Sequence, residues 1–273
     1  MPAVAGAQAG CFPASALSNA IIAAQSLGGI VRADKRAADE LRPVKLTPHF
    51  IPHAEGSVLI EVGGTRVVCT ASVDDGVPSW RKGTGQGWIT SEYGMLPRAT
   101  HQRTPRDAGR GRQSGRSQEI QRLIGRSLRA IAHLESLGER TIWVDCDVIQ
   151  ADGGTRTAAI TGGYVALGLA CRRLVDGRIL RTLPLTDSVA AVSVGIVDGE
   201  FFLDLTYAED SRAQVDMNVV LTGSGHLVEI QATAEGRPFT QAEMERLLAL
   251  GRKGAEQLIA QQQAILHFNF AQP

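Results

Sequence analysis

The stretch Gln150-Ala-Asp-Gly-Gly-Thr-Arg-Thr-Ala-Ala-Ile-Thr-Gly-Gly163 decides the fold, because it joins two kinds of regular structure through a pair of glycines. The residues before it, 141–149, alternate apolar and polar side chains with a period of two, which predicts a β-strand. The residues after it contain no proline until Pro184, which permits a long helix. We therefore predict a strand, a tight Gly-Gly turn and the first turn of a helix.

The turn in this stretch is a candidate anion-binding site. Backbone N–H groups at the start of a helix bind phosphate well when glycines let the anion approach closely. Here Gly153 and Gly154 supply the glycines, and Arg156 adds a guanidinium beside them. The same residues are also compatible with an ordinary strand-to-helix turn whose arginine is solvated. The rest of the chain must decide between these two interpretations.

The composition is that of a globular protein with unevenly distributed charge. The chain has 273 residues, of which 44% are hydrophobic, so it can bury the core of one large domain or two small ones. Its formal net charge is zero, but residues 81–129 contain eleven lysines and arginines against three acids. Such a segment can be a solvated face, yet arginine rather than lysine favours bidentate recognition of phosphate or carboxylate. We therefore expect a polyanionic partner.

The four cysteines, Cys11, Cys69, Cys146 and Cys171, show no close pairing in the sequence. Two of them lie in apolar, strand-like runs, which is typical of buried free thiols in a reducing compartment. No Lys or Arg precedes the apolar region 14–30, as a secretory signal would require, and no apolar run is long enough to span a membrane. We therefore expect a cytoplasmic protein without a membrane partner.

The first thirty residues differ from the rest of the chain. Residues 1–30 contain no charged side chain and are rich in Ala, Gly and Ser. We predict a disordered or non-native extension over 1–30 and a single domain over 31–273. Val31 is then a candidate natural first residue, read from a valine-type initiation codon. N-terminal mass analysis that finds natively expressed protein starting before residue 31 would contradict this hypothesis.

Short turns with glycine separate three pairs of strand-like runs. Each pair is predicted as a hairpin: 57–62 with 65–73, 188–197 with 200–207, and 215–222 with 226–232. Ser117 is expected to cap a helix that ends before Gly138, which places Arg116 at its N-terminus. Thr240 and Glu243 form a capping box that opens a final helix.

Between the first hairpin and the first helix, residues 74–115 form a long polar stretch with spaced glycines and several arginines. A structureless loop of this length in a compact domain is usually either functional or disordered. The glycines are not a dinucleotide-binding motif, since no strand leads into them and no helix follows at once. The order of strands and helices favours an α+β layered domain of mixed β-sheets with packed helices.

A pair of acids, Asp210 and Asp216, flanks the turn between Tyr207 and Val215. An acidic turn can be an ordinary solvated hairpin. Alternatively it can hold Mg²⁺, which takes one or two carboxylates together with substrate phosphates and neutralises charge on phosphate oxygens. The six histidines are scattered and none is placed as a general base. Inorganic phosphate acting as the nucleophile would need no such base.

Six segments along the chain form long motifs that chance similarity cannot supply together. They are Leu41-Arg-Pro-Val44, His53-Ala-Glu-Gly-Ser-Val-Leu59, Gly85-Gln-Gly-Trp-Ile-Thr-Ser-Glu-Tyr-Gly-Met-Leu-Pro-Arg98, Gln118-Glu-Ile-Gln-Arg-Leu-Ile-Gly-Arg-Ser-Leu-Arg129, Cys146-Asp-Val-Ile-Gln-Ala-Asp-Gly-Gly-Thr-Arg-Thr157 and Asp216-Met-Asn-Val-Val220. On these motifs the chain, from about Arg32 to Leu266, resembles the ribonuclease PH family of bacterial phosphorolytic 3′-to-5′ exoribonucleases. The resemblance implies an RNase PH-like fold and reversible nucleotidyl transfer that trims tRNA precursors and other RNA 3′ ends.

The resemblance also implies roles for individual residues. Inorganic phosphate, the co-substrate, would be held by Arg116, Gly154, Thr155 and Arg156. Asp210 and Asp216 would serve as catalytic residues and Mg²⁺ ligands, and Arg98, Arg103 and Arg106 would bind the RNA near its 3′ end. The family forms a hexameric ring, a trimer of dimers, so a homohexamer is expected. The one local departure is Ser211-Arg212, because relatives usually have small residues between the two aspartates.

Two other functions are compatible with the same residues. Some relatives in RNA-degrading rings have lost catalysis, so the chain could be a catalytically inactive RNA-binding ring subunit. Retention of both arginines and both aspartates argues against this alternative. A hydrolytic nuclease could use the same carboxylates on two metals. Nucleoside diphosphate as the product distinguishes phosphorolysis from hydrolysis, which releases nucleoside monophosphate.

Overall fold

The computed structural model describes residues 32–106, 111, 113–268 and 270. The expected extension over 1–30, with Cys11, and the candidate first residue Val31 lie outside the described residues. Cys69, Cys146 and Cys171 are buried free thiols, as expected from their apolar surroundings.

The first sheet has five strands in the order β1-β2-β3-β5-β4. The predicted first hairpin is confirmed as β2 and β3, and the strand before the Gly-Gly turn is β5. Neighbouring strands are antiparallel except β4, which runs parallel to β5, so the sheet is mixed. The bounds are Val44–Pro48 for β1, Gly56–Val62 for β2, Thr65–Asp75 for β3, Trp88–Met95 for β4 and Arg140–Gln150 for β5.

The second sheet has four antiparallel strands in the order β7-β6-β8-β9. It contains the two other predicted hairpins, β6 with β7 and β8 with β9. The bounds are Val189–Val197 for β6, Glu200–Leu203 for β7, Val215–Thr222 for β8 and Leu227–Ala234 for β9.

Three long helices pack on the sheets. Their bounds are Gly115–Arg129 for α1, Thr155–Asp176 for α3 and Gln241–Leu266 for α5. The single-turn elements are the 3-10 helix η1 at Ser79–Arg81, α2 at Leu134–Leu137 and α4 at Tyr207–Asp210. The predicted capping box of Thr240 and Glu243 opens α5.

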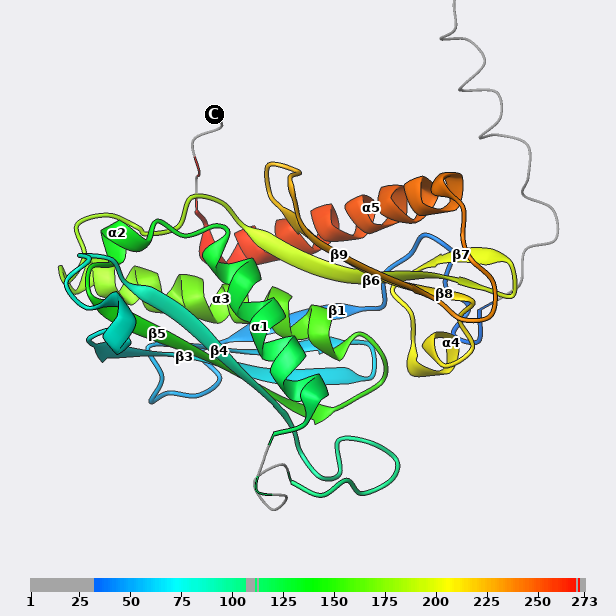
Figure 1. Cartoon of the computed structure of the whole chain (residues 1–273), viewed down its shortest axis with the longest axis horizontal. Coiled ribbons are helices and arrows are strands. Elements are labelled where there is room, and N and C mark those ends of the chain that lie inside the picture. Colours follow the sequence, from blue (N-terminus) through cyan, green and yellow to red (C-terminus); the bar gives the residue numbers. More distant parts are fainter. Residues whose placement is uncertain (1–31, 107–110, 112, 269, 271–273) are drawn as a thin grey trace, which may run out of the picture. The chain divides into compact units, whose positions relative to one another are not determined.

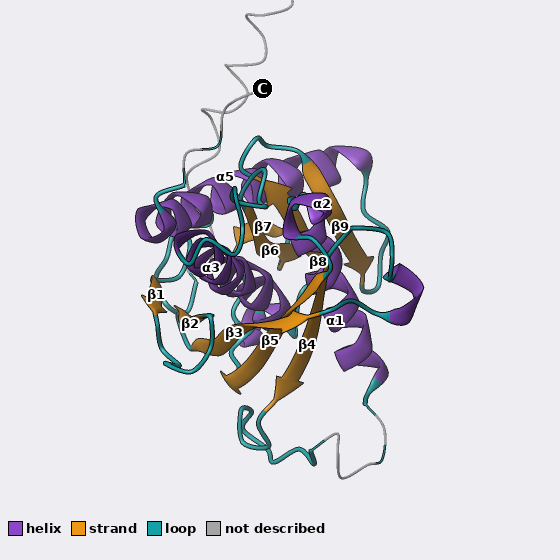
Figure 2. Ribbon diagram, turned by 90° about the vertical axis from the view of Figure 1, so that its left-hand side faces the viewer, coloured by secondary structure: helices purple, strands orange, loops and turns teal. Residues whose placement is uncertain are grey.

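The layers are arranged around α3, which lies between the two sheets (Figures 1 and 2). One side of α3 packs on β2, β3 and β5, and the other side packs on β6, whose opposite face is covered by α5. This explains why all nine residues of β6 are buried. Val189 and Ala191 join the core around α3, whereas Ala190 and Val192 join the core under α5. The predicted α+β layered fold is confirmed.

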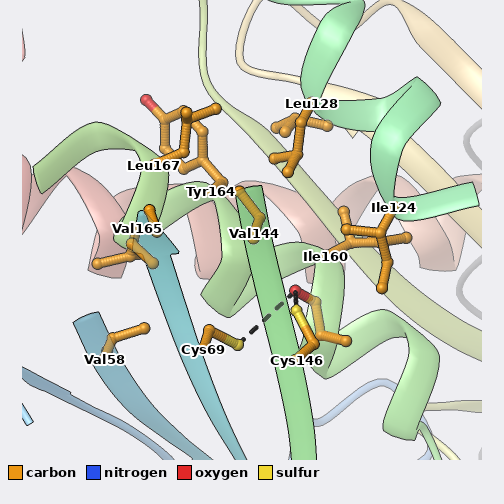
Figure 3. Packing of buried hydrophobic residues seen from close by; sticks show 14 of the residues in the cluster. Val58, Cys69, Ile124, Leu128, Val144, Cys146, Ile160, Tyr164, Val165 and Leu167 are labelled. Atoms are coloured by element: carbon orange, nitrogen blue, oxygen red, sulfur yellow. Dashed lines mark hydrogen bonds between the residues drawn. The ribbon is translucent and has the colours of Figure 1, made fainter. Parts of the chain in front are cut away.

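The larger core shows why the residues after the Gly-Gly turn form a helix that is apolar on nearly every side. Figure 3 shows Ile160 and Tyr164 of α3 among side chains of the first sheet and α1, and both are almost fully buried. The thiol groups of Cys69 and Cys146 lie beneath the first turns of α3 and contact the carbonyl of Ala159. Burial of this kind stabilises the fold by roughly 1.5–3 kcal/mol for each large side chain. This packing also fixes the position and direction of the start of α3.

Two sequence-based expectations were wrong in the region before β5. The polar stretch 74–115 is not structureless, since it contains β4, whose alternating Ile89 and Tyr93 face the core. The sequence gives only a weak signal for this strand. Its partner is the parallel strand β5, and nothing in the residues of β4 itself indicates that pairing. The helix after it begins at Gly115, capped by Ser114 rather than Ser117, because the Ser114 side chain accepts a hydrogen bond from the Ser117 backbone N–H.

Two further element boundaries and one turn differ from the prediction. Helix α1 ends at Arg129, and Gly138 follows the separate short helix α2. The return strand of the second hairpin ends at Leu203 rather than at 207. The chain then turns through Asp204, which has a positive φ of 56°, and forms α4. The turn that carries Asp210 is therefore one turn of helix rather than a simple hairpin loop.

Among the described residues, one helix is long and apolar enough to cross a membrane, which corrects the expectation that the chain has no such run. It is α3, with a mean hydropathy of 1.2 over its most apolar window. In the structure 83% of that window is buried inside the protein. A helix that is hydrophobic on all sides is also what a position between two sheets requires.

Candidate active site

One cavity of about 350 Å³ brings together residues that are far apart in the sequence. Its walls come from the start of α1, the β5–α3 turn, α4 and the second sheet. All six residues expected to bind phosphate or to supply carboxylates line it: Arg116, Gly154, Thr155, Arg156, Asp210 and Asp216.

The floor of the cavity is the Gly-Gly turn between β5 and α3. Gly153 and Gly154 both have positive φ, 75° and 64°, which L side chains rarely adopt. A Cβ on Gly153 would lie 2.5 Å from the carbonyl oxygen of Leu205. Among the residues that the structure describes, no side chain caps this end of α3, and its first turn contains no acid. The helix therefore presents unsatisfied N–H groups and the positive end of its dipole, which suit an anion.

The first turn of α3 is held in place by hydroxyl groups. The hydroxyl of Thr155 is hydrogen-bonded to that of Tyr93, on β4, at 2.8 Å. Tyr93 is buried, and this burial raises the pKa of its phenol, so it remains a neutral partner. The Thr157 hydroxyl donates to the carbonyl of Gly154 at 2.9 Å. These contacts fix the orientation of the N–H groups at the helix start.

Two arginines approach the same floor from different helices. Arg116 is exposed at the start of α1 and has no hydrogen-bond or ion-pair partner among the residues that the structure describes. Arg156 is largely buried, and its Nη1 donates to Oε1 of Gln231 at 2.8 Å. The carboxylate of Glu119 lies 3.5 Å from the same nitrogen. The positive charges of both guanidinium groups act to lower the pKa values of Asp210 and Asp216, the two aspartates opposite.

The acid pair forms the other wall. Asp210 is the last residue of α4, and Asp216 is the second residue of β8. Burial, and then the charge of Asp210, raise the pKa of Asp216 against the opposing charges of Arg156 and Arg116, and the net pKa is about 6. Asp210 is exposed as a residue, but the protein around its carboxyl desolvates it and raises its pKa, again against the two arginines.

The acid pair fits a hard divalent cation. Within the described part of the chain, no hydrogen bond or ion pair occupies either carboxylate, so their oxygens are available. No group of three or more His, Cys, Asp or Glu side chains is placed to hold a metal among the described residues. Two carboxylates, with the remaining positions left to water and substrate phosphate, are the usual protein ligands of Mg²⁺.

Buried ion pairs hold α4 and its aspartate in position. Arg32 donates from Nε and Nη2 to the two carboxylate oxygens of Glu209, each at 2.7 Å, and stacks over the ring of Phe202. Glu209 also completes a capping box with Thr206 at the start of α4. Burial would raise the pKa of Glu209, but the hydrogen bonds from Arg32 and Thr206 outweigh it and lower the pKa. Asp210 is therefore attached to a rigid support.

A second buried pair ties the Gly-Gly turn to α4. Arg42 donates from Nη2 and Nε to the carboxylate of Asp204 at 2.6 and 2.9 Å, and from Nη1 to the carbonyl of Asp152. The Asp152 carboxylate accepts from the backbone N–H of Tyr207 at 3.3 Å. Asp152 therefore braces the turn against the start of α4 and does not cap α3.

The three arginines expected to bind RNA are not brought into the cavity. Arg98, Arg103 and Arg106 are exposed on the segment that follows β4. In the described residues none of the three side chains has a hydrogen-bond or ion-pair partner, although the charge of Arg106 partly offsets the rise that burial causes in the pKa of Asp147. The base of this segment is fixed next to the floor, because the Ala151 N–H donates to the carbonyl of Ala99 at 2.8 Å.

Arg212, the local departure from the family pattern, is directed away from the acids. Its Nε donates to the carbonyl of Ala208 at 3.1 Å, and its Nη1 pairs with the Asp198 carboxylate at 3.4 Å. The guanidinium is therefore engaged on the outer side of the turn.

The sequence analysis missed several residues of the site. Ser193 and Asn218 are cross-strand partners in β6 and β8 and both line the cavity. The signal that could have found them is a polar side chain inside an otherwise apolar strand. Glu119 and Gln231, which contact Arg156, gave no such signal, since both lie on partly exposed faces. The other missed lining residues are Met95, Thr100, Ala151 and Tyr207, whereas Gly153 was already part of the candidate anion-binding turn.

Comparisons with known proteins agree with this architecture. Residues 40–172 match domain 1 of the 3′ exoribonuclease family, and residues 187–254 match its domain 2. A chain of the Archaeoglobus fulgidus exosome with RNA bound to the active site is 23% identical, with a TM-score of 0.73 over 84% of this chain and 92% of that chain. Rice (Oryza sativa) Rrp46 is 21% identical, with a TM-score of 0.69 over 87% of this chain and 100% of that chain. A chain of an archaeal exosome core is 23% identical, with a TM-score of 0.68 over 86% of this chain and 90% of that chain.

The structural similarities, at these low identities, show the fold alone, whereas the family matches extend over most of the chain. The matched segments divide the cavity between them. Domain 1 supplies Arg116 and the floor at the start of α3, and domain 2 supplies Asp210 and Asp216. The chain therefore belongs to the 3′ exoribonuclease family of RNase PH proteins.

Proposed function

We propose that this chain is a phosphate-dependent 3′-to-5′ exoribonuclease of the ribonuclease PH type. One observation carries the proposal: a cationic floor and an acid pair face each other across a single cavity. The floor, with Arg116 and Arg156, can hold inorganic phosphate. The carboxylates opposite can assist cleavage of the phosphodiester, as a proton donor and as metal ligands. Neither feature alone would favour phosphorolysis over hydrolysis.

The floor positions the nucleophile in this proposal. N–H groups at the start of α3, with the Arg116 and Arg156 guanidinium groups, bind inorganic phosphate and orient one of its oxygens towards the last phosphodiester of an RNA 3′ end. The new bond joins that oxygen to the phosphorus, and the bond from phosphorus to the 3′ oxygen of the preceding nucleotide breaks. Positioning and charge stabilisation supply the catalysis, as in other phosphoryl transfers. The products are a nucleoside diphosphate and an RNA one residue shorter.

The acid pair serves the leaving group. The departing 3′ oxygen needs a proton, and a carboxyl with a raised pKa is a suitable donor. Asp216, whose pKa is about 6, is the better donor, and Asp210 is the more accessible ligand. Mg²⁺ would be held by Asp210, joined by Asp216 once Asp216 has given up its proton, and would neutralise charge on the phosphate oxygens when bound. The reverse reaction uses the same groups, so the phosphate concentration sets the direction.

The exposed arginines extend the proposal to the substrate. Arg98, Arg103 and Arg106 are solvated cations on a segment whose base lies beside the floor, so they can contact the RNA backbone upstream of the 3′ end. The substrates we propose are tRNA precursors and other RNA 3′ ends. We further propose a homohexameric ring of three dimers in the cytoplasm, on the basis of the family resemblance.

The product of RNA degradation tests the proposed function. Purified protein is incubated with Mg²⁺ and an RNA carrying a labelled 3′ nucleotide, with and without inorganic phosphate, and the released nucleotide is identified. We expect nucleoside diphosphate, released only when phosphate is present. Nucleoside monophosphate released without phosphate would establish the hydrolytic alternative. RNA binding with no product under either condition would establish an inactive RNA-binding subunit.

A further inference from the structure

We infer that Gln231 is a positioning residue that holds the Arg156 guanidinium in a phosphate-binding orientation. The inference rests on the proposed function, because it concerns how the floor binds phosphate. Gln231 lies on β9, the edge strand of the second sheet, directly opposite Asn218 of β8, which lines the cavity. It is thus a domain 2 residue in contact with a phosphate-binding arginine of domain 1.

The contacts of Arg156 show how it is oriented. Its Nη1 donates to the Gln231 side-chain oxygen at 2.8 Å. Among the described residues, its Nε and Nη2 make no hydrogen bond. A guanidinium has five N–H donors in a planar fork, so holding it at one nitrogen leaves other donors for a bidentate contact with phosphate. Gln231 fixes the plane of the fork while leaving those donors available.

The amide group of Gln231 also controls the nearest carboxylate. Its Nε2 donates to Oε1 of Glu119 at 2.9 Å, and that same oxygen lies 3.5 Å from Nη1 of Arg156. The distance is beyond a strong charge-assisted hydrogen bond. By binding Glu119 from one side and Arg156 from the other, Gln231 keeps the two ions from closing into a tight pair. A tight pair would compete with phosphate for the guanidinium.

Gln231 is itself fixed from the outer side. Its Nε2 donates to Oε1 of Glu229, two residues earlier on β9, at 3.1 Å. Glu229 is held in turn by Arg126 of α1 through contacts of 2.8 to 3.0 Å. Hydrogen bonds of 2.8 to 3.1 Å therefore link α1, β9 and α3 through the series Arg126, Glu229, Gln231 and Arg156. An amide suits the central position because it accepts from an arginine and donates to carboxylates without adding charge.

Kinetics of the Gln231→Ala variant test the inference. Loss of one charge-assisted hydrogen bond and closure of Glu119 on Arg156 should raise the KM for phosphate by at least about tenfold. The KM for RNA should remain close to that of the wild type. Gln231→Glu should also raise the KM for phosphate, although it keeps the side-chain length, because its added negative charge competes for Arg156. Gln241→Ala, on the exposed first turn of α5, is the matched control and should behave as the wild type.

The second-site variant separates positioning from a merely structural role. In Gln231→Ala the released Glu119 carboxylate is the competitor, so the added Glu119→Gln change should restore most of the phosphate affinity. An unchanged KM for phosphate in Gln231→Ala, or an absence of rescue in the double variant, would overturn the inference. Titration calorimetry with inorganic phosphate alone gives the same comparison without turnover. A wild type that binds phosphate but releases no nucleoside diphosphate would count against the proposed function and leave the inference standing.

Discussion

The proposed phosphate-binding floor and the acid pair face each other in one cavity but are built in different ways. The floor belongs to long regular elements, because Gly154 and Arg156 start a helix of 22 residues whose body is buried between two sheets. Asp210 ends a helix of four residues, which has too little packing of its own to hold a position. The difference teaches that one wall is fixed by the hydrophobic core and the other by buried ion pairs.

This difference follows from the charge that each wall must present. A floor for an anion can use backbone N–H groups, which any well-packed helix start provides. Carboxylates for a cation must come from side chains, and those of Asp210 and Asp216 are kept close together against their mutual repulsion. The contacts of Arg32 with Glu209 and of Arg42 with Asp204 hold the backbone around them. Four experiments test this comparison, in order of decreasing expected effect.

Removing the guanidinium from the floor should have the largest effect. Arg156→Ala loses charge-assisted hydrogen bonds of roughly 1.5–3 kcal/mol each, so the loss of two should lower phosphate-dependent turnover by at least about 100-fold. RNA affinity should largely survive, because the exposed loop arginines are untouched. Steady-state kinetics with varied phosphate and an RNA-binding titration measure the two effects. An equal loss of RNA affinity would argue against a dedicated phosphate role.

The buried ion pair between Arg32 and Glu209, which supports the acid pair, should contribute measurably to the free energy of unfolding. Arg32→Ala removes the main partner of the buried Glu209 carboxylate and leaves the weaker 3.8 Å ion pair with Arg36, and breaking a buried pair costs about 3–5 kcal/mol of unfolding free energy. Denaturant unfolding followed by circular dichroism measures the loss. The control is Lys253→Ala, which breaks the exposed contact between Lys253 and Asp39 and should cost at most about 1 kcal/mol. Similar losses in both variants would mean that burial does not distinguish the two pairs.

The third experiment concerns the exposed arginines, whose positive charges lie outside the cavity that holds the floor and the acid pair. If Arg98, Arg103 and Arg106 each contact one backbone phosphate, replacing all three with glutamine should reduce the slope of log affinity against log salt by about two units, at ~0.7 per phosphate. The measurement is RNA binding over a series of salt concentrations. The KM for phosphate should not change. A slope equal to that of the wild type would place these side chains away from the RNA.

The experiment with the smallest expected effect measures how cation binding at the acid pair depends on pH. Because burial and Asp210 raise the pKa of Asp216 to about 6, its carboxylate form, the proposed Mg²⁺ ligand, is lost as the pH falls below 6. The Mg²⁺ affinity of the protein without phosphate should therefore be about tenfold weaker at pH 5 than at pH 7. Titration calorimetry at the two pH values measures it.

The sign of the stability effect is opposite to that of a salt-bridged acid. The folded protein keeps the Asp216 proton up to about pH 6, whereas the unfolded chain loses it near the ordinary value of 3.8. Stability should therefore fall as the pH rises through this window. The Asp216→Asn variant should lose the part of both dependences that comes from Asp216, and what remains should come from Asp210 and the other acids. A Mg²⁺ affinity that is flat between pH 5 and pH 7 in the wild type would contradict the raised pKa.

Local signals in the sequence predicted much of the fold. The Gly63-Gly64 turn, the Asp198-Gly199 turn and the capping box at Thr240 are each read from a few neighbouring residues, and each is found where expected. Strand β4 was missed because its pairing with β5 joins residues about fifty positions apart in the sequence. The start of α1 was misplaced because Ser114 and Ser117 are both suitable caps, and only the hydrogen bond to the Ser117 N–H distinguishes them.

By itself, the sequence determined that Gly153 and Gly154 form a turn before a helix, that Arg156 follows it, and that a cationic segment and two nearby acids exist. These are properties of contiguous residues, set by φ preferences, periodicity and charge. Only the tertiary structure decided that Asp210 and Asp216 face Arg116 and Arg156, that Arg32 and Arg42 support them, and that Gln231 meets Arg156. Such contacts depend on how two sheets pack around α3, and packing between distant segments leaves no local pattern in the chain.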